Sequence, residues 1–236
     1  MGNSCLFTWR HVAADLILCA VWWYLRDALS DRDMEELLRE RGVWGDHTTV
    51  CRWVQREAPA LNQRCRLSLR ATNASHRVYE TSIKIKKPWY DLYRAVDSTG
   101  ATLDFMPSPT RRADAAERFF RQVLQASHRR TPRAITVDKH AAYPLAFEAL
   151  QHDGTLPETC LHRPCKYLNT VVEQDHRLVT RRVNPGLGLR PFHTARQTIQ
   201  GDEAMHRPHK GQIEGSVKRD VLAQNRVINQ LFGWAA

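Results

Sequence analysis

The most constraining feature of the sequence is a four-residue run, Ala-Ile-Thr-Val at 134–137, which ends directly at Asp138. A short apolar, β-branched run bounded by polar residues predicts a buried strand. A second acidic residue, Glu173, lies in KYLNTVVEQDHR, which predicts a helix, and 34 residues separate the two acids. A strand-end Asp and a helical Glu that converge on one point would offer Mg²⁺ the carboxylate oxygens that it prefers, held on rigid elements.

Residues 12–57 predict three short helices. Ser30 begins an S-x-x-D capping signal for the second helix, and Gly42 ends it. Asp46 is expected to cap the third helix, at 47–57. Two helices joined by a short glycine-containing turn are typical of a helix-turn-helix, although a bundle that only packs on its neighbour fits equally well. In a helix-turn-helix the third helix lies in the major groove. The polar residues expected to reach DNA are Thr48, Thr49, Arg52, Gln55 and Arg56.

The middle of the chain predicts an α+β domain. Residues 59–75 are polar and basic with little periodicity, which indicates a linker whose arginines follow a phosphate backbone. Three antiparallel strands are then expected at 78–85, 89–96 and 101–106, the last two joined by the turn Asp97-Ser98-Thr99-Gly100. A helix at 112–125, the strand ending at Asp138, a helix at 141–150, a short segment at 159–162 and the helix with Glu173 follow. This order alone fits several α+β folds.

Charge and hydropathy narrow the class of partner. The chain carries 35 Lys+Arg against 25 Asp+Glu, a formal charge of +10, which favours nucleic acid, although an ordinary basic surface has the same composition. The longest apolar stretch, at 16–25, is about half of the ~20 residues that a membrane span needs, and predicts a buried helix. The 6 cysteines are scattered, as suits a reduced cytoplasm. No membrane partner is expected.

The sequence motifs around the two acidic residues resemble those of the bacterial DDE transposases of the insertion-sequence-six family, and the resemblance extends over nearly the whole chain. The matching strings are VDK at Asp138, VVEQDHR at Glu173 and YRAVDS around Asp97. The resemblance implies a ribonuclease-H-like (integrase/transposase) catalytic core with a mixed five-stranded sheet. It divides the chain into a helix-turn-helix at 1–58, a basic linker at 59–75, the core at 76–204 and a C-terminal tail at 205–236.

The same resemblance implies a chemistry and a set of partners. Asp138 and Glu173 become catalytic residues and ligands of Mg²⁺, with Mn²⁺ as a substitute. The partners become double-stranded DNA, both terminal inverted repeats and target, and further copies of the chain in a homodimer or higher oligomer. Further DNA contacts are expected from Lys166, Arg177 and Arg181. Basic pairs such as Arg111-Arg112 also fit a DNA path, although a pair of this kind is more often a solvated part of the surface.

The first carboxylate of the family's site is missing. Where the family reads WRVDETY, residues 76–82 read HRVYETS, so that Tyr79 occupies the position of the first Asp. A tyrosine is neutral near pH 7 and is a poor Mg²⁺ ligand. Strand alternation is expected to turn Glu80 away, and Asp97, the one possible substitute, is expected to serve the hairpin turn. We therefore expect weakened metal binding and impaired strand cleavage.

Two further departures point the same way. Thr180 stands where the family has a basic residue on the helix with Glu173, and Pro208 is expected to interrupt a C-terminal helix. The leading hypothesis is a transposase with a damaged site. The alternative is a catalytically dead DNA-binding protein that occupies element ends or inhibits an active relative. A general nuclease of the same fold is a third possibility, and it would need the missing acid equally.

Overall fold

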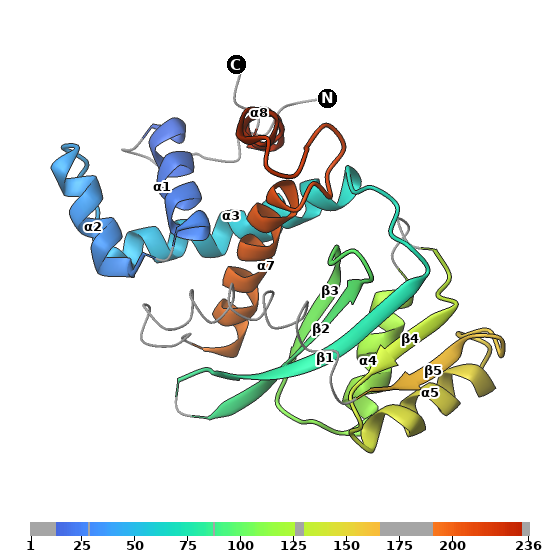
Figure 1. Ribbon diagram of the computed structural model, residues 1–236. Helices are drawn as coiled ribbons and strands as arrows, with labels where there is room; N and C mark the ends of the chain where they lie inside the picture. The colour runs from blue at the N-terminus through green and yellow to red at the C-terminus, as the bar shows by residue number, and fades with distance from the viewer. Residues whose placement is uncertain (1–12, 28, 87, 126–129, 166–190, 233–236) are drawn as a thin grey trace. The chain divides into compact units, whose positions relative to one another are not determined.

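The chain is divided into two units, each with its own core. The computed structural model describes residues 13–27, 29–86, 88–125, 130–165 and 191–232 (Figure 1). One unit combines Met1–Leu69 with Arg181–Ala236, and the other is Arg70–Thr180. Within the described residues, every helix is too short or too polar to cross a membrane.

The first unit begins with three helices, α1 (Ala14–Arg26), α2 (Asp31–Glu40) and α3 (His47–Leu67). The turn between α2 and α3 contains Gly42 at φ +72°, a left-handed conformation that favours glycine. The three predicted helices are confirmed, and residues 41–46 join α2 to α3.

Both predicted N-caps are confirmed. The Ser30 hydroxyl accepts the Asp33 amide hydrogen at 3.2 Å, and the Asp33 carboxylate accepts the Ser30 amide hydrogen at 2.7 Å. The Asp46 carboxylate accepts the Thr49 amide hydrogen at 2.7 Å. These bonds satisfy amide groups that have no partner inside the helix, which explains why α2 and α3 begin at these residues.

Helix α3 is longer than the sequence pattern predicts, so the expected linker is wrong over residues 59–67. The helix passes through Pro59 and continues to Leu67. Leu61 and Cys65 are buried at helical spacing, and this apolar contact outweighs the hydrogen bond that a proline removes.

The C-terminal part of the chain belongs to the same unit. Helix α7 (Phe192–His209) packs against α3 and α1, and α8 (Val221–Phe232) packs against α7 and α3. The apolar residues of the C-terminal part that complete this core are Ala204, Met205, Ile213, Val227 and Ile228. The predicted division at residue 205 therefore falls inside a helix.

Pro208 does not interrupt α7 as expected. It lies in the last turn of the helix, which ends at His209. A proline leaves the carbonyl four residues earlier without its helical donor. That carbonyl belongs to Ala204, and the Cys65 thiol of α3 donates to it at 3.5 Å. A side chain from a distant part of the sequence thus replaces part of what Pro208 removes.

Helix α7 meets α3 and α1 at a glycine. A Cβ atom on Gly201 would lie 2.6 Å from the Ala58 Cβ and 2.8 Å from the Leu25 Cδ1. We expect Gly201→Ala to lower the free energy of unfolding of this unit by about 1–3 kcal/mol, measured by urea denaturation, because the helices must separate. Gly45→Ala is the control, since its nearest side-chain atoms are 4.0 Å away. Unchanged stability of Gly201→Ala would contradict the packing.

The second unit is built on a five-stranded mixed sheet. Its strands are β1 (Ser75–Lys84), β2 (Trp89–Asp97), β3 (Thr102–Ser108), β4 (Ala134–Val137) and β5 (Leu161–Pro164). The order is β3-β2-β1-β4-β5, in which β1, β2 and β3 pair antiparallel, and β4 is parallel to both β1 and β5. This is the ribonuclease-H-like topology that the resemblance implies.

Helices α4 (Ala113–Leu124) and α5 (Ala142–His152) form the main core of this unit with the sheet (Figure 1). Their shared core contains Val78, Tyr93, Ile135 and Val137 from the sheet and Phe119, Phe120, Val123, Tyr143 and Phe147 from the helices. Tyr79 belongs to a separate cluster with Val96, as expected from strand alternation. The sheet therefore presents Val78 and Tyr79 to opposite faces.

Candidate active site

Asp138 lies directly after β4, at the edge of the sheet where β1 and β4 run side by side. The parallel register pairs Ser75 with Ala134 and Arg77 with Thr136. Two residues further along each strand are Tyr79 and Asp138. Continued by two residues, this register sets Tyr79 level with Asp138, and Tyr79 is where the resemblance places the first carboxylate.

Tyr79 offers little to a metal ion at that position. Its side chain packs with Val96 and the residue is 7% exposed. Directly across on β2 lies Arg94, which is 1% exposed. A phenol is a much weaker ligand for a hard cation than a carboxylate.

Glu80 points to the face that α5 covers. Its carboxylate accepts hydrogen bonds from the Tyr143 hydroxyl and from the Arg111 guanidinium. Burial raises the pKa of Glu80, and the nearby Asp138 carboxylate adds to this, while the two hydrogen bonds oppose it. The pKa of Tyr143 is raised well above its ordinary value, first by burial and then by Glu80. Glu80 therefore does turn away from Tyr79, yet its carboxylate remains near Asp138.

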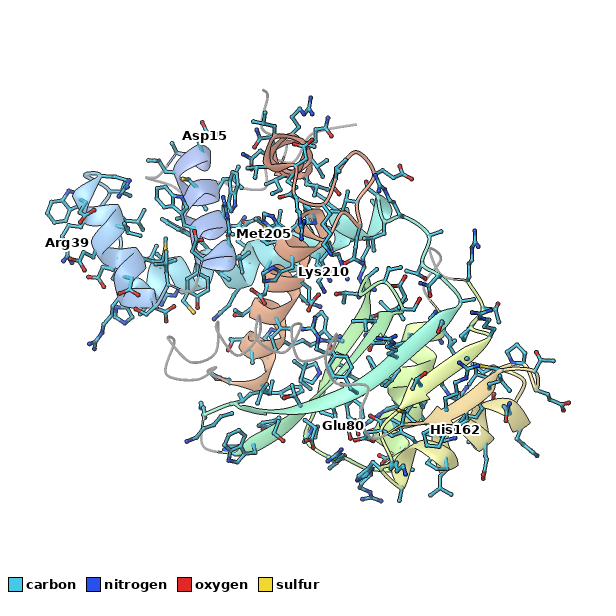
Figure 2. The ribbon with its side chains drawn as sticks, viewed as in Figure 1. Asp15, Arg39, Glu80, His162, Met205 and Lys210 are labelled. Atoms are coloured by element: carbon cyan, nitrogen blue, oxygen red, sulfur yellow. The ribbon has the colours of Figure 1, made fainter. Side chains whose placement is uncertain are left out.

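Arg111 connects the two carboxylates. Its Nη2 lies 2.9 Å from the Asp138 Oδ2 and also pairs with Glu80. The other oxygen, Asp138 Oδ1, accepts the His140 amide hydrogen at 3.0 Å. Both oxygens of Asp138 thus have a donor within the protein. Figure 2 labels Glu80 at this edge of the second unit, among the side chains of the sheet and its helices.

Asp97, the predicted substitute for the missing acid, is used by the hairpin turn. Its Oδ1 accepts the amide hydrogen of Thr99 at 2.9 Å and that of Ala101 at 3.0 Å, and its Oδ2 accepts the amide hydrogen of Asn73 at 3.2 Å. The residue is 3% exposed. Gly100 follows at φ +87°, which completes the predicted turn. These bonds occupy both oxygens of Asp97.

The remaining candidates of the catalytic region lie outside the described residues. They are Glu173, Thr180 and the basic residues Lys166, Arg177 and Arg181.

The described residues do not fit a two-metal site. Metal ligation of this kind needs several carboxylate oxygens that converge without competing donors. In the described ranges, no three His, Cys, Asp or Glu side chains come together in a way that could hold an ion. Asp138 is already paired with Arg111, and the neighbouring strand position carries Tyr79.

The polar side of α3 is only partly open. Arg52 and Arg56 are exposed, while Thr48, Thr49 and Gln55 are half-buried. The hydroxyls of Thr48 and Thr49 both donate to the Asp46 carboxylate at 2.8 Å. The two hydroxyls and the Thr49 amide lower the pKa of Asp46 to about 2.

A hollow of about 260 Å³ lies along this side of α3. Three of the predicted DNA contacts line it, and so do residues from the starts of α2 and α7. Its lining consists of Asp31, His47, Thr48, Cys51, Arg52, Gln55, Pro191 and Thr194. Of the five DNA contacts predicted on α3, only Arg52 and Arg56 are therefore exposed.

Sequence reasoning missed the roles of Arg111 and Tyr143. The sequence offered Arg111 either a solvated position or a DNA contact, whereas its guanidinium pairs with Glu80 and Asp138. One signal was present: strand alternation turns Glu80 to the face that the following helices must cover, where an acid needs a donor. The identity of that donor depends on how the chain segments meet.

Solved structures with a similar fold have low sequence identity to this chain. The integrase catalytic core domain of HTLV-2 in complex with magnesium, in its dimeric form, is 18% identical, with 61% of this chain and 96% of that chain covered and a TM-score of 0.44. The Mos1 strand transfer complex is 13% identical, with 93% and 75% covered and a TM-score of 0.38. Likeness at this level carries no weight for function.

Sequence relatives are much closer. Residues 73–212 match the DDE domain of transposases of the IS240 type. The transposase for the insertion sequence-like element IS431mec of Staphylococcus aureus is 35% identical over 204 residues, which cover 86% of this chain and 88% of the relative. The transposase for element IS257 in transposon Tn4003 matches to the same extent. The chain therefore belongs to the DDE transposases of the insertion-sequence-six family.

Proposed function

We propose that this protein binds the terminal inverted repeats of an insertion sequence and is impaired in the metal-dependent cleavage and transfer of DNA strands. The observation that carries the proposal is the position of Tyr79, beside Asp138 on the adjacent strand. With Glu173 the site retains two of three acids. We expect Mg²⁺, or Mn²⁺ in its place, to bind more weakly than a complete site would allow.

DNA binding is supported by α3 and by charge. The helix follows a glycine turn, is capped by Asp46 and exposes Arg52 and Arg56. The chain as a whole carries a formal charge of +10. A capped helix with exposed arginines is suited to contact base edges and phosphates in the major groove. Two ends must meet in transposition, so we expect a homodimer or larger assembly on DNA.

The test is the affinity for end DNA. We expect Arg52→Gln with Arg56→Gln to weaken binding of a labelled duplex taken from the DNA flanking the coding region by at least about tenfold, measured by fluorescence anisotropy. Each lost base contact costs about 1–3 kcal/mol, and each lost phosphate contact lowers the salt dependence by about one unit of slope.

The matched control removes the same charge from α2. Arg32 and Arg39 are both exposed there, and Arg39 pairs with Glu35 in the same helix. We expect Arg32→Gln with Arg39→Gln to leave the affinity within about twofold, since neither residue lies on the helix proposed to enter the major groove. Equal losses in the two double variants would mean that charge alone binds DNA, and that α3 does not read it.

A second candidate function is that of a catalytically dead DNA-binding protein that inhibits an active relative. The pairing of Asp138 with Arg111 favours it, because the one described acid of the site already has a cation. Added to an active relative on the same ends, such a protein should lower strand transfer in proportion to its share of the mixture. The α3 double variant should not.

A further inference from the structure

Arg111 joins two carboxylates that differ in their access to solvent. The Glu80 side chain is 2% exposed, whereas the Asp138 side chain is 40% exposed. Glu80 is held in addition by the Tyr143 hydroxyl. Glu80 is therefore the fixed partner of Arg111, and Asp138 is the partner that an ion from solvent can reach.

The two contacts of Arg111 also differ in strength. A buried carboxylate that loses its cation is costly, so Arg111 stays with Glu80. Water screens the half-exposed contact with Asp138, which makes that contact easier to break. The guanidinium can thus release Asp138 while it remains on Glu80.

The contact with Arg111 and the His140 amide together hold the Asp138 carboxylate in place. Glu80 and Tyr143 lie on the face of the sheet that α5 covers, and Tyr79 lies on the opposite face. By binding Glu80 and Asp138 together, Arg111 links the Asp138 carboxylate to a side chain on the face away from Tyr79. A cation that approaches from the Tyr79 side would compete with this link for the Asp138 carboxylate.

We propose that Arg111 is a positioning residue that holds Asp138 in an ion pair and thereby opposes the binding of a divalent cation to Asp138. The inference rests on the proposed function, which makes Asp138 a metal ligand, and adds the residue that competes for it. Competition follows because both cations need the Asp138 Oδ2, and two like charges a few ångströms apart repel each other.

The test is Mn²⁺ binding to the metal-free full-length protein without DNA, followed by the electron paramagnetic resonance signal of free Mn²⁺. Arg111→Gln should raise the affinity on the order of tenfold, because it removes the competing charge. Glu80→Gln should lower the affinity or leave it unchanged, since Arg111 then has Asp138 as its remaining carboxylate partner. A purely structural role would move both variants in the same direction.

Two further variants guard against misfolding and charge effects. The double variant Arg111→Gln, Glu80→Gln removes the buried Glu80 carboxylate together with its cation. It should show the same increase in Mn²⁺ affinity as Arg111→Gln alone. Arg112→Gln removes the same charge one residue along, where the partner is Asp114 at 3.6 Å on the surface, and it should change nothing.

The outcomes separate this inference from the function on which it rests. Equal affinity of the double variant and the unaltered protein, including no detectable binding by either, overturns the inference, as does a lower affinity of the double variant. Adding Asp138→Asn to the double variant should cancel its gain. If adding Asp138→Asn leaves the Mn²⁺ affinity of the double variant unchanged, the ion does not bind at Asp138. The role of Asp138 as a metal ligand in the proposed function is then wrong as well.

Discussion

Replacing Tyr79 by Asp should raise Mg²⁺- or Mn²⁺-dependent joining of labelled inverted-repeat ends by about a hundredfold or more. Several kcal/mol of transition-state stabilisation come from bound metal in such reactions, and each 1.36 kcal/mol is about tenfold in rate. The variant supplies an anionic oxygen on β1, two residues beyond the position that pairs with Thr136 of β4. The measurement is a strand-transfer assay on gels, with the unaltered protein in parallel.

Tyr79→Asn is the matched control, since it has the size of Asp without the charge and should show no gain. If a folded Tyr79→Asp protein also shows no gain, the first ligand lies elsewhere or the change at Thr180 limits the reaction, which Thr180→Lys in the same protein would reveal. If the unaltered protein already reacts, another carboxylate completes the site, and Tyr79 is not the lesion that we infer.

Replacing Asp97 by Ala should destabilise the second unit by about 1–3 kcal/mol, because several donors of the hairpin turn lose their acceptor at once. Those donors include the Thr99 hydroxyl at 2.6 Å and the amide groups of Thr99 and Ala101. Hydrogen exchange followed by mass spectrometry would show the loss as faster exchange in peptides from β1, β2 and β3.

Asp91→Ala is the control for this loss. Asp91 lies on the same strand, and its contact with the Ser82 hydroxyl, at 3.5 Å, is long, so we expect a change within about 0.5 kcal/mol. The Asp97 variants also test its predicted role as a substitute ligand. Asp97→Asn should leave the Mn²⁺ affinity unchanged. A lower Mn²⁺ affinity with unchanged stability would instead indicate that Asp97 is a metal ligand.

Much of the fold could be predicted because its signals are local. The caps at Ser30 and Asp46 and the turn from Asp97 to Gly100 each depend on a few neighbouring residues, and each is confirmed. The strand that ends at Asp138 is also confirmed. The topology came from the family resemblance, because the same order of elements fits more than one fold.

The errors arose where distant segments decide the outcome. Proline at 59 and at 208 indicated helix ends, but tertiary contacts keep both residues inside helices. The compensating thiol of Cys65 lies 139 residues from the Ala204 carbonyl that it reaches. Likewise Arg111 lies 31 residues from Glu80 and 27 from Asp138, so no local pattern could have assigned it to them.

The first unit is formed by two separate stretches of the sequence, and this affects the order in which the protein can fold during translation. Its core joins α3 to α7 and α8, which come from opposite ends of the sequence, while Arg70–Thr180 forms a unit of its own between them. During translation the sheet can therefore form first, whereas the partners of Leu61 and Cys65 in α7 and α8 are synthesised after it. A product that stops before α7 would keep its proposed DNA-reading helix but not the packing that holds it. We therefore expect a fragment that stops before α7 to lose the proposed binding to the ends of the element.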